Sequence, residues 1–546
     1  MLLYDSEYYI ERNMLIRLLF VAIFNLVLLP SLAYDFEVDG IFYDTLSSKT
    51  CEVVRGDRYA SEVISIPRTV SFEGRVFDVV RVGSDAFYGQ TEVKTIYIPA
   101  SVTNIGSEAF MHCKKLTMIE VESDNLIYST YQGALYNKQR TRLIKVPIGK
   151  TEFTIPSGIL EIGDDAFHEC RMLRMVEIPS GVIRIGANAF AGCDSLREIE
   201  IPNSVERIGE YAFAGCKAIM SLLLPNDLKE IGRSAFSFCT SLNTIKLPTG
   251  LDTISDGLFN GCTNLNDVII PSGITTIGAY SFAQCDSLKA IYIPNTVISI
   301  GSNAFYGCSL LTSVELPESV MSIGNQAFEY CQRIDTINIP ENVTEIGDQV
   351  FNGCKSLAYI DVREGNTAYR SFWGALYDHK LSRLIKVPSL TNSDSIPKSV
   401  KHICPYAYFK CGVLTRVSIP ENVSTIGEWA FVGCASLDSV YMSTPLNLSE
   451  TYLPLETRTL YVPKGKKTDF ETSSYYAGQY SLFKTIVEYG NSPVSIYQPS
   501  VIGNNSNEGT IYSLQGVRLA GNESILTKGV YIIDGKKVVV NNHIRK

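Results

Sequence analysis

Ile185-Gly186-Ala187-Asn188-Ala189-Phe190-Ala191-Gly192-Cys193 is one copy of a pattern, I-G-x-x-A-F-x-x-C, that recurs along most of this 546-residue chain. Successive copies are 23 residues apart, except for two steps of 57 residues. A fixed period in the twenties, with apolar residues in phase, is typical of a solenoid of stacked coils. The positions equivalent to Gly186 are Gly83, Gly106, Gly163, Gly209, Gly232, Ser255, Gly278, Gly301, Gly324, Gly347, Cys404 and Gly427.

A single coil combines a strand with a tight bend. The apolar residues within 196–201 alternate with polar ones, which predicts a strand, and Pro202 ends that strand because it has no N–H to donate. Gly209 permits a bend that a side chain would resist. We expect residues 210–214 to make one short helical turn, with Phe213 packed inside.

One coil alone buries too little apolar surface to offset the entropy of ordering its chain. Stacking neighbours removes this deficit, and the stacked strands then form a parallel sheet with a spacing of about 4.8 Å. In such a stack, Phe190, Phe213 and Phe236 are expected to form a buried aromatic spine. The fold expected from the residues is therefore a repeat solenoid, mostly β with short helical turns.

The full repeat reads L-x-x-I-x-I-P-x-x-V-x-x-I-G-x-x-A-F-x-x-C over residues 63–440. It resembles the BspA-like, or Treponema pallidum-type, leucine-rich repeats of the LRR_5 type. The resemblance implies a curved, right-handed leucine-rich-repeat solenoid with a parallel sheet. It also implies a secreted or surface protein of host-associated, Bacteroidota-like bacteria. Some proteins similar to this one are adhesins, so the resemblance favours an extracellular protein or glycan as the partner.

The two long steps contain related inserts. Residues 133–136 (G-A-L-Y) return as residues 374–377, and residues 142–147 (R-L-I-K-V-P) return as residues 383–388. Two short apolar runs separated by a polar loop predict a β-hairpin. We expect each insert to project a hairpin from the solenoid; the alternative is a longer coil without a role of its own.

The N-terminus has the features of a secretory signal. Residues 18–29 form an almost unbroken apolar run, preceded by Arg12 and Arg17, and a small-residue cleavage site predicts a cut after Ala33. The acidic residues before Met14 do not suit a signal, so Met14 is a candidate start. The run is short for a membrane span of about 20 residues. The predicted location is secreted or at the outer cell surface, with no transmembrane span after signal removal.

Departures from the repeat set the expected domain boundaries. Residues 509–546 resemble C-terminal β modules of secreted Bacteroidota proteins, including sorting domains of the type IX export route. The alternative is a small β module without a sorting role. The predicted organisation is a signal peptide (1–33), an N-terminal cap (34–75), a solenoid (76–440) with enlarged hairpin coils near 122–155 and 363–396, a C-terminal cap (441–490), a linker (491–508) and a C-terminal β module (509–546).

Twelve of the fourteen cysteines, from Cys113 to Cys434, occupy one repeat position. Parallel Cβ vectors in neighbouring coils do not suit the dihedral angle of a disulfide. We therefore expect a ladder of reduced, buried thiols that donate weakly to loop carbonyls. The exceptions are Cys51 and Cys404, and a Cys404–Cys411 bridge is the alternative to free thiols there.

The net charge of −9 disfavours nucleic acid as a partner, because phosphate binding needs a basic surface.

The motifs of the sequence argue against catalysis. The five histidines show no metal-ligand spacing, and no serine lies in a nucleophile elbow. Carboxylates are spread over turns, so no pair suited to glycoside cleavage stands out. We expect no catalytic residue, no metal and no cofactor, and an enzyme is the least favoured function.

Outward side chains of the stacked strands offer the natural binding surface of a solenoid. The residue two places before each coil's proline is expected there, and the consecutive positions Leu223, Lys246, Ile269 and Tyr292 form an apolar stripe with one cation. Such a stripe suits a partner site, although strand propensity alone could also make it apolar. The favoured function is a binding protein, and the alternative is a structural spacer that displays its C-terminal module. The candidate binding face comprises Tyr97, Glu177, Glu200, Leu223, Lys246, Ile269, Tyr292 and Glu315.

Overall fold

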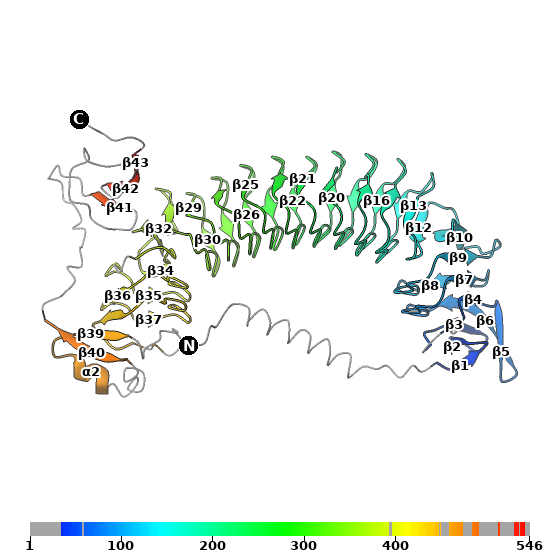
Figure 1. Cartoon of the computed structure of the whole chain (residues 1–546), viewed down its shortest axis with the longest axis horizontal. Helices are drawn as coiled ribbons and strands as arrows, with labels where there is room; N and C mark the ends of the chain where they lie inside the picture. The colour runs from blue at the N-terminus through cyan, green and yellow to red at the C-terminus, as the bar shows by residue number, and fades with distance from the viewer. Residues whose placement is uncertain are drawn as a thin grey trace. The chain divides into compact units, whose positions relative to one another are not determined.

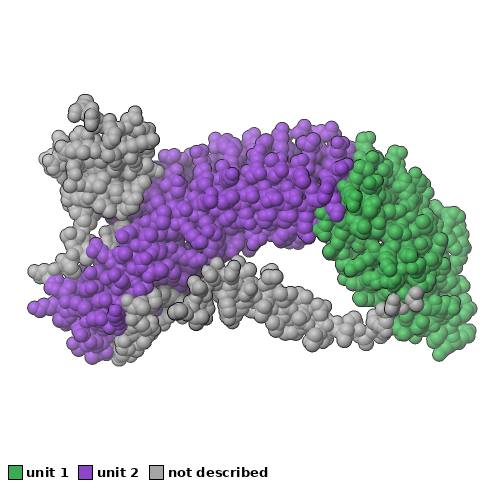
Figure 2. Space-filling view, viewed as in Figure 1, with its two compact units in different colours: residues 1–182, 189–194 green, residues 183–188, 195–546 purple. Residues whose placement is uncertain are grey.

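The computed structural model describes residues 34–56, 59, 61–392, 396–446, 448, 458–472 and 483–490, and the backbone of residues 511–513, 529–533 and 536–540. The chain divides into two compact units (Figure 2). Unit 1 comprises residues up to 182 with 189–194, and unit 2 comprises residues 183–188 with 195 onward. Within the described residues, the regular structure is β except for one helix, α2 (Lys467–Thr472). The predicted signal peptide and the predicted linker lie outside the described residues.

Each regular coil begins with a strand from its L-x-x-I-x-I-P segment, here called the first strand. In β21 (Thr244–Lys246) only the middle residue, Ile245, is buried. Within groups of two or three coils, neighbouring first strands pair in parallel and in register, as β21 does with β23 (Asp267–Ile269). The predicted parallel sheet is therefore confirmed. The other first strands are β4 (Val63–Ser65), β7 (Thr95–Ile98), β9 (Met118–Val121), β13 (Glu152–Thr154), β15 (Met175–Glu177), β17 (Glu198–Ile199), β19 (Ser221–Leu222), β25 (Ala290–Tyr292), β27 (Ser313–Glu315), β29 (Thr336–Ile339), β31 (Tyr359–Val362), β36 (Arg416–Ile419) and β38 (Ser439–Met442).

A second, shorter strand lies just before each anchor glycine and forms a second row along the coils (Figure 1). In unit 2, β18 (Arg207–Ile208) pairs in parallel with β20 (Glu230–Ile231), which buries the two isoleucines on the same side. The other second strands of regular coils are β8 (Asn104–Ile105), β14 (Glu161–Ile162), β16 (Arg184–Ile185), β22 (Thr253–Ile254), β24 (Thr276–Ile277), β26 (Ser299–Ile300), β28 (Ser322–Ile323), β30 (Glu345–Ile346), β35 (His402–Ile403) and β37 (Thr425–Ile426).

The bend after the anchor glycine is not helical, so the expected helical turn at residues 210–214 is wrong. Residues 210–215 form consecutive turns, with Tyr211 (φ 53°) and Gly215 (φ 72°) in the left-handed region. A right-handed helix needs negative φ, so Tyr211 interrupts it. The N–H groups of Tyr211, Phe213 and Gly215 instead donate to carbonyls of the next coil, at 2.9, 2.8 and 2.7 Å; the acceptors are Arg233, Ala235 and Ser237. The bend thereby adds a third hydrogen-bonded ladder between coils.

Left-handed backbone costs a residue with a Cβ about 1–2 kcal/mol. Glycine avoids this cost, and it occupies the second left-handed position in several coils, as at Gly215, Gly261 and Gly307. Large aromatic residues nevertheless occupy left-handed positions of the bend elsewhere in unit 2. They are Tyr211, Phe238, Tyr280, Tyr330, Tyr406 and Trp429.

The core of each coil is closed by an aromatic ring and a thiol. From Phe213 to Phe351, successive spine rings stack within 24° of parallel, with centroids 5.2–6.0 Å apart. In unit 1, Phe167 and Phe190 stack in the same way at 4.7 Å. The expected stacking of Phe213 on Phe236 is therefore confirmed.

The cysteines form the predicted thiol ladder. None of the fourteen forms a disulfide, and all but Cys404 are buried. The thiol of Cys262 donates to the carbonyl of Phe236 at 3.0 Å, and Cys308 donates to Phe282 at 3.1 Å. Because Cys404 and Cys411 are also free, the alternative bridge between them is wrong.

The enlarged coils each contain a three-stranded antiparallel meander, so the predicted hairpins are present. One meander is β10 (Tyr128–Tyr131), β11 (Ala134–Asn137) and β12 (Arg142–Lys145); the other is β32 (Tyr369–Phe372), β33 (Ala375–Asp378) and β34 (Arg383–Lys386). The expectation that they project is wrong. Leu135, Tyr136 and Leu143 are fully buried, and β12 continues the second row by pairing in parallel with β14.

One asparagine holds the start of each enlarged coil. Asn125 is fully buried; its amide donates to the carbonyls of Pro99 and Val102 at 3.0 and 2.9 Å, and its oxygen accepts from the N–H groups of Ile127 and Tyr128. Asn366 repeats all four bonds at the equivalent positions. The sequence comparison of the inserts did not single out either asparagine.

A buried lysine compensates for a shortened turn in each enlarged coil. In a regular coil, four residues separate the buried isoleucine of the second strand from the spine phenylalanine, but only two separate Leu143 from Val146. Val146 makes the ladder bond that a spine phenylalanine makes elsewhere, and the Lys145 ammonium donates to the carbonyl of Asp165 at 2.8 Å. Lys386 makes the equivalent bond at 3.3 Å. The lysine thus supplies a donor where the turn is missing.

Sheets of different topology lie at the chain ends. The N-terminal sheet has the order β1 (Phe36–Val38), β2 (Ile41–Thr45), β3 (Thr50–Val53), β6 (Arg75–Val82) and β5 (Thr69–Phe72). Gln90 replaces the ladder cysteine in the first coil, and its side chain accepts from the N–H of Tyr59. After β38, the parallel strands β39 (Thr459–Pro463) and β40 (Thr485–Tyr489) follow. A separate antiparallel sheet contains β41 (Ile511–Ser513), β42 (Gly529–Ile533) and β43 (Lys536–Val540).

Candidate functional site

Six of the eight predicted binding-face residues lie in unit 2 on successive first strands or directly after them. All six side chains are exposed: Glu200, Leu223, Lys246, Ile269, Tyr292 and Glu315. Leu223 is 88% exposed, Ile269 52% and Tyr292 67%, so these large apolar side chains are not part of the core. We call Leu223, Lys246, Ile269 and Tyr292 the apolar stripe. Its backbone is held by the sheet, whereas its side chains face solvent.

The register of the strands determines which of these side chains are neighbours. Lys246 is in register with Ile269, and Tyr292 is in register with Glu315. Strands β23 and β25 also lie next to each other. On the other exposed position of each strand stand small or short residues, Ser221, Thr244, Asp267 and Ala290. The side chains next to the stripe are therefore short, so the larger side chains of the stripe extend beyond them into solvent.

Tyr97 and Glu177 belong to unit 1 and form a separate set. Tyr97 is 45% exposed and in register with Glu120. Glu177 is exposed and accepts a hydrogen bond from the hydroxyl of Thr154 at 3.0 Å. Both side chains are accessible, but neither neighbours a residue of the apolar stripe along its own sheet.

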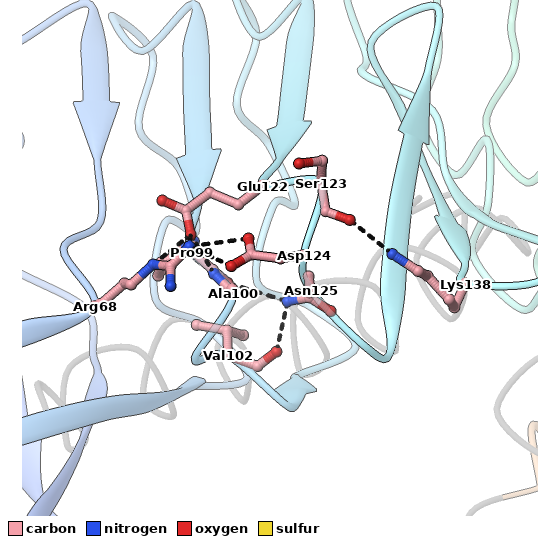
Figure 3. Close-up of polar contacts among 9 residues, drawn as sticks. All are labelled: Arg68, Pro99, Ala100, Val102, Glu122, Ser123, Asp124, Asn125 and Lys138. Carbon is pink, nitrogen blue, oxygen red and sulfur yellow. Dashed lines mark hydrogen bonds and ion pairs between the residues drawn. The ribbon is translucent and has the colours of Figure 1, made fainter.

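A polar cluster in unit 1 escaped the sequence analysis because its members are far apart in the chain (Figure 3). Arg68 donates to Glu122 at 2.8 Å and to both oxygens of Asp124 at 2.9 and 2.7 Å. The Arg68 guanidinium lowers the pKa of Asp124. Glu122 also accepts from the N–H of Ala100 at 2.7 Å. Both carboxylates are engaged by donors, so the cluster ties a loop of the N-terminal sheet to the first enlarged coil and offers no free base.

The buried ionisable groups lie inside the coils rather than at a surface site. Burial raises the pKa of Cys262 and Cys354 to about 12, so these thiols stay protonated and unreactive at neutral pH. Burial lowers the pKa of Lys386 and raises that of Glu329 to about 7. Within the described part of the chain, no three His, Cys, Asp or Glu side chains gather as a metal site.

Two groups of aromatic residues were also missed, one exposed and one half-buried. Phe238 and Tyr280, at the left-handed positions of the bend, are 51% and 48% exposed. At the C-terminal coils, Tyr441 and Tyr461 stack with centroids 4.6 Å apart, and the ring of Tyr489 lies 6.0 Å from that of Tyr441. Spacing could have found the first group, because it requires only a comparison of residue types at each repeat position.

Comparison with known protein families gives one match. The BspA type leucine rich repeat region matches in six copies, over residues 71–154, 147–266, 252–375 and 386–453. No curated protein sequence matches significantly. No helix in the described residues is both long and apolar enough to cross a membrane.

Solved structures of bacterial leucine-rich repeat proteins are similar to the chain. One from Bacteroides ovatus shares 24% identity, with 83% of this chain and 100% of that chain covered and a TM-score of 0.47. One from Eubacterium ventriosum shares 30% identity over 46% of this chain and 62% of that chain, with a TM-score of 0.36. A leucine rich cell surface protein from Faecalibacterium prausnitzii shares 19% identity, covering 84% and 95%, with a TM-score of 0.27.

Proposed function

Because the chain belongs to the BspA-type leucine-rich repeat family, we propose that it is an extracellular, non-enzymatic binding protein that recognises a protein through the apolar stripe of unit 2. The observation that carries the proposal is the exposure of Leu223, Ile269 and Tyr292 on neighbouring strands. Protein interfaces are centred on such large apolar and aromatic anchors, surrounded by polar residues. Here Glu200 and Glu315 provide the polar ends.

The rigidity of the stripe supports recognition. Its strands are held by parallel, in-register pairing, and each side chain stands next to a buried residue of the core. A partner therefore binds without ordering a loop, which lowers the entropic cost of association. The extracellular location rests on the apolar N-terminal segment 18–29 and the small residues that follow it.

The double variant Ile269→Ser and Tyr292→Ser tests the proposal. Purified extracellular-matrix proteins on an array are probed with the wild-type chain and the variant. The variant should lose at least ten-fold in affinity for any protein that the wild type binds, with an unchanged melting temperature. A matched control is Ile298→Ser with Met321→Ser, which removes side chains of similar exposure, 46% and 49%, away from the stripe. Equal loss in both variants, or no loss in either, would refute a role for the stripe.

A structural spacer remains the second candidate function. Its supporting observation is the separate three-stranded sheet β41–β43 that follows the coils. Deletion of residues 491–546 distinguishes the two functions. Binding that survives the deletion supports recognition by the repeats, and binding that disappears supports a spacer that carries a C-terminal binding module.

A further inference from the structure

The bend of each coil in unit 2 forms a second solvent-exposed surface, separate from the apolar stripe. We call it the turn face and define it by the two left-handed positions of each bend, equivalent to Tyr211 and Gly215. Phe238 and Tyr280 stand on it, two coils apart, and about half of each side chain is exposed. Two coils correspond to about 10 Å along the stack.

The fold does not require aromatic residues at these positions. At the position of Phe238, other coils have Gly215, Gly261 or Gly307, and at the position of Tyr280 another has Asn303. Glycine and asparagine adopt left-handed backbone most readily, so a phenylalanine or tyrosine there is strained. Bulky residues kept in strained backbone conformations are concentrated at functional sites.

The coil between the two rings has no side chain at either of its left-handed positions. Both of its left-handed positions are glycine, Gly257 and Gly261. The Phe238 ring lies against Gly261 so closely that a Cβ on that glycine would be 2.5 Å from the ring's Cδ1. One side of the ring is therefore supported by the next coil's backbone, and the rest faces solvent. Phe238 is held as a fixed platform.

The cation on these bends, Arg233, is already engaged by the Glu210 carboxylate at 3.5 Å and lies over the Tyr211 ring, and several other polar groups are uncharged. Gln284 is exposed and occupies the position equivalent to Gly261 in the next coil. Ser234, in the bend of Phe238, and Asn260, in the bend of Gly261, are partly exposed. The carboxylate of Asp256, nearby in the chain, already accepts from the N–H of Ala279 at 2.7 Å. The surface thus alternates aromatic rings with amide and hydroxyl groups, and it lacks the continuous apolar area of a protein interface.

We propose that the turn face around Phe238 and Tyr280 binds a neutral oligosaccharide. A sugar ring has an apolar face of C–H groups, which is attracted to the negative face of an aromatic ring, and an edge of hydroxyls that pair with amides. Phe238 stands at the second left-handed position of its bend and Tyr280 at the first, so a sugar chain that contacts both rings would cross the coils obliquely. This site is independent of the apolar stripe and requires no charge on the ligand.

The test uses Phe238→Gly with Tyr280→Asn, which installs residues that other coils already carry. Calorimetric titration with neutral hexasaccharides (cellohexaose, xylohexaose, mannohexaose and maltohexaose) should show binding of at least one by the wild-type full chain. The variant should bind that sugar at least ten-fold more weakly, while its melting temperature stays equal or rises because strain is relieved. A merely structural role for the rings predicts a lower melting temperature instead.

Gln349→Asn provides the matched control, since it changes a left-handed position of the bend without removing a ring. It should leave sugar binding intact. The proposal is overturned if no hexasaccharide binds the wild type at millimolar concentration, or if the Phe238→Gly, Tyr280→Asn variant binds as well as the wild type. It is also overturned if binding is lost with Ile269→Ser and Tyr292→Ser instead, because the sugar would then occupy the stripe.

Discussion

Glu329 is a carboxylate enclosed by the wall of the coils, 5% exposed. Its oxygen accepts from the amide of Gln326 at 2.6 Å. Burial raises the pKa of Glu329 to about 7, and the hydrogen bond from Gln326 and the charges of Lys386 and Lys410 lower it by less. The raised pKa means that the ionised carboxylate is only partly compensated, and its charge opposes folding.

Glu329→Gln should therefore stabilise the protein at pH 8 but not at pH 4.5. The folded state binds the Glu329 proton more tightly than the unfolded chain, whose pKa is near 4.5, so this group's contribution to the free energy of unfolding falls between about pH 4.5 and 7 and is constant above that. The gain at pH 8 has an upper limit of about 3 kcal/mol. Urea unfolding followed by circular dichroism at both pH values measures it.

Glu315→Gln serves as the control for this measurement, since Glu315 is an exposed glutamate on the first strand β27. It should change the stability little at either pH. A stability gain from Glu329→Gln that is the same at pH 4.5 and pH 8 would contradict a raised pKa in the folded state.

At the scale of the element, the enlarged coils show how an irregular insert is fitted into a regular stack. Each replaces one bend by a meander whose strands are buried, and each uses an asparagine and a lysine to pair the backbone groups that the bend would have paired. These polar residues recur at the same separation of 241 residues as the apolar motifs of the insert. The two inserts are therefore the same structural unit used twice.

Asn366→Ala should destabilise unit 2 strongly. The substitution removes four hydrogen bonds at once, to Pro340, Val343, Ala368 and Tyr369, from a side chain that is 2% exposed. Each buried backbone group left without a partner costs about 1–3 kcal/mol, so we expect a loss of at least about 3 kcal/mol. Chemical denaturation and faster amide exchange in residues 366–386 would report it.

Asn342→Ala is the comparison for that variant. Asn342 is exposed and makes a single bond, to the carbonyl of Glu318 at 2.8 Å. Its loss should cost below about 1 kcal/mol. Similar effects from both substitutions would mean that Asn366 does not hold the enlarged coil together.

At the scale of the whole molecule, stability is a sum of coils and their interfaces, because each coil contacts chiefly its neighbours. Deletion of residues 256–278 removes one period and brings Ser255 to the anchor position next to Ala279. The shortened chain should fold, with a cooperative melt and a melting temperature lowered by only a few degrees. Deletion of residues 256–266, half a coil, should abolish the cooperative melt because it takes every later residue out of register.

The repeat period made the coil, the parallel strands, the spine and the thiol ladder predictable, since each depends on one residue type at one position. The left-handed bend was not predictable from periodicity, because Tyr211 is an unusual residue for that conformation and a helical turn has the same length. The burial of the meanders was not predictable either, because it depends on how Leu135 and Tyr136 pack against residues that are distant in the sequence. The exposure of the stripe was predicted from strand alternation, whereas the turn face needed the backbone angles.

The cysteine thiols are sensitive to oxidation in the unfolded chain but not in the folded one. Once the coils close, each thiol is shielded by the adjacent spine carbonyl and is inert. Before closure, twelve cysteines in nearly identical local sequences have nothing to direct one partner over another, so an oxidant would cross-link coils at random. In the presence of an oxidant, closure of the coils therefore competes with cross-linking of the unfolded chain.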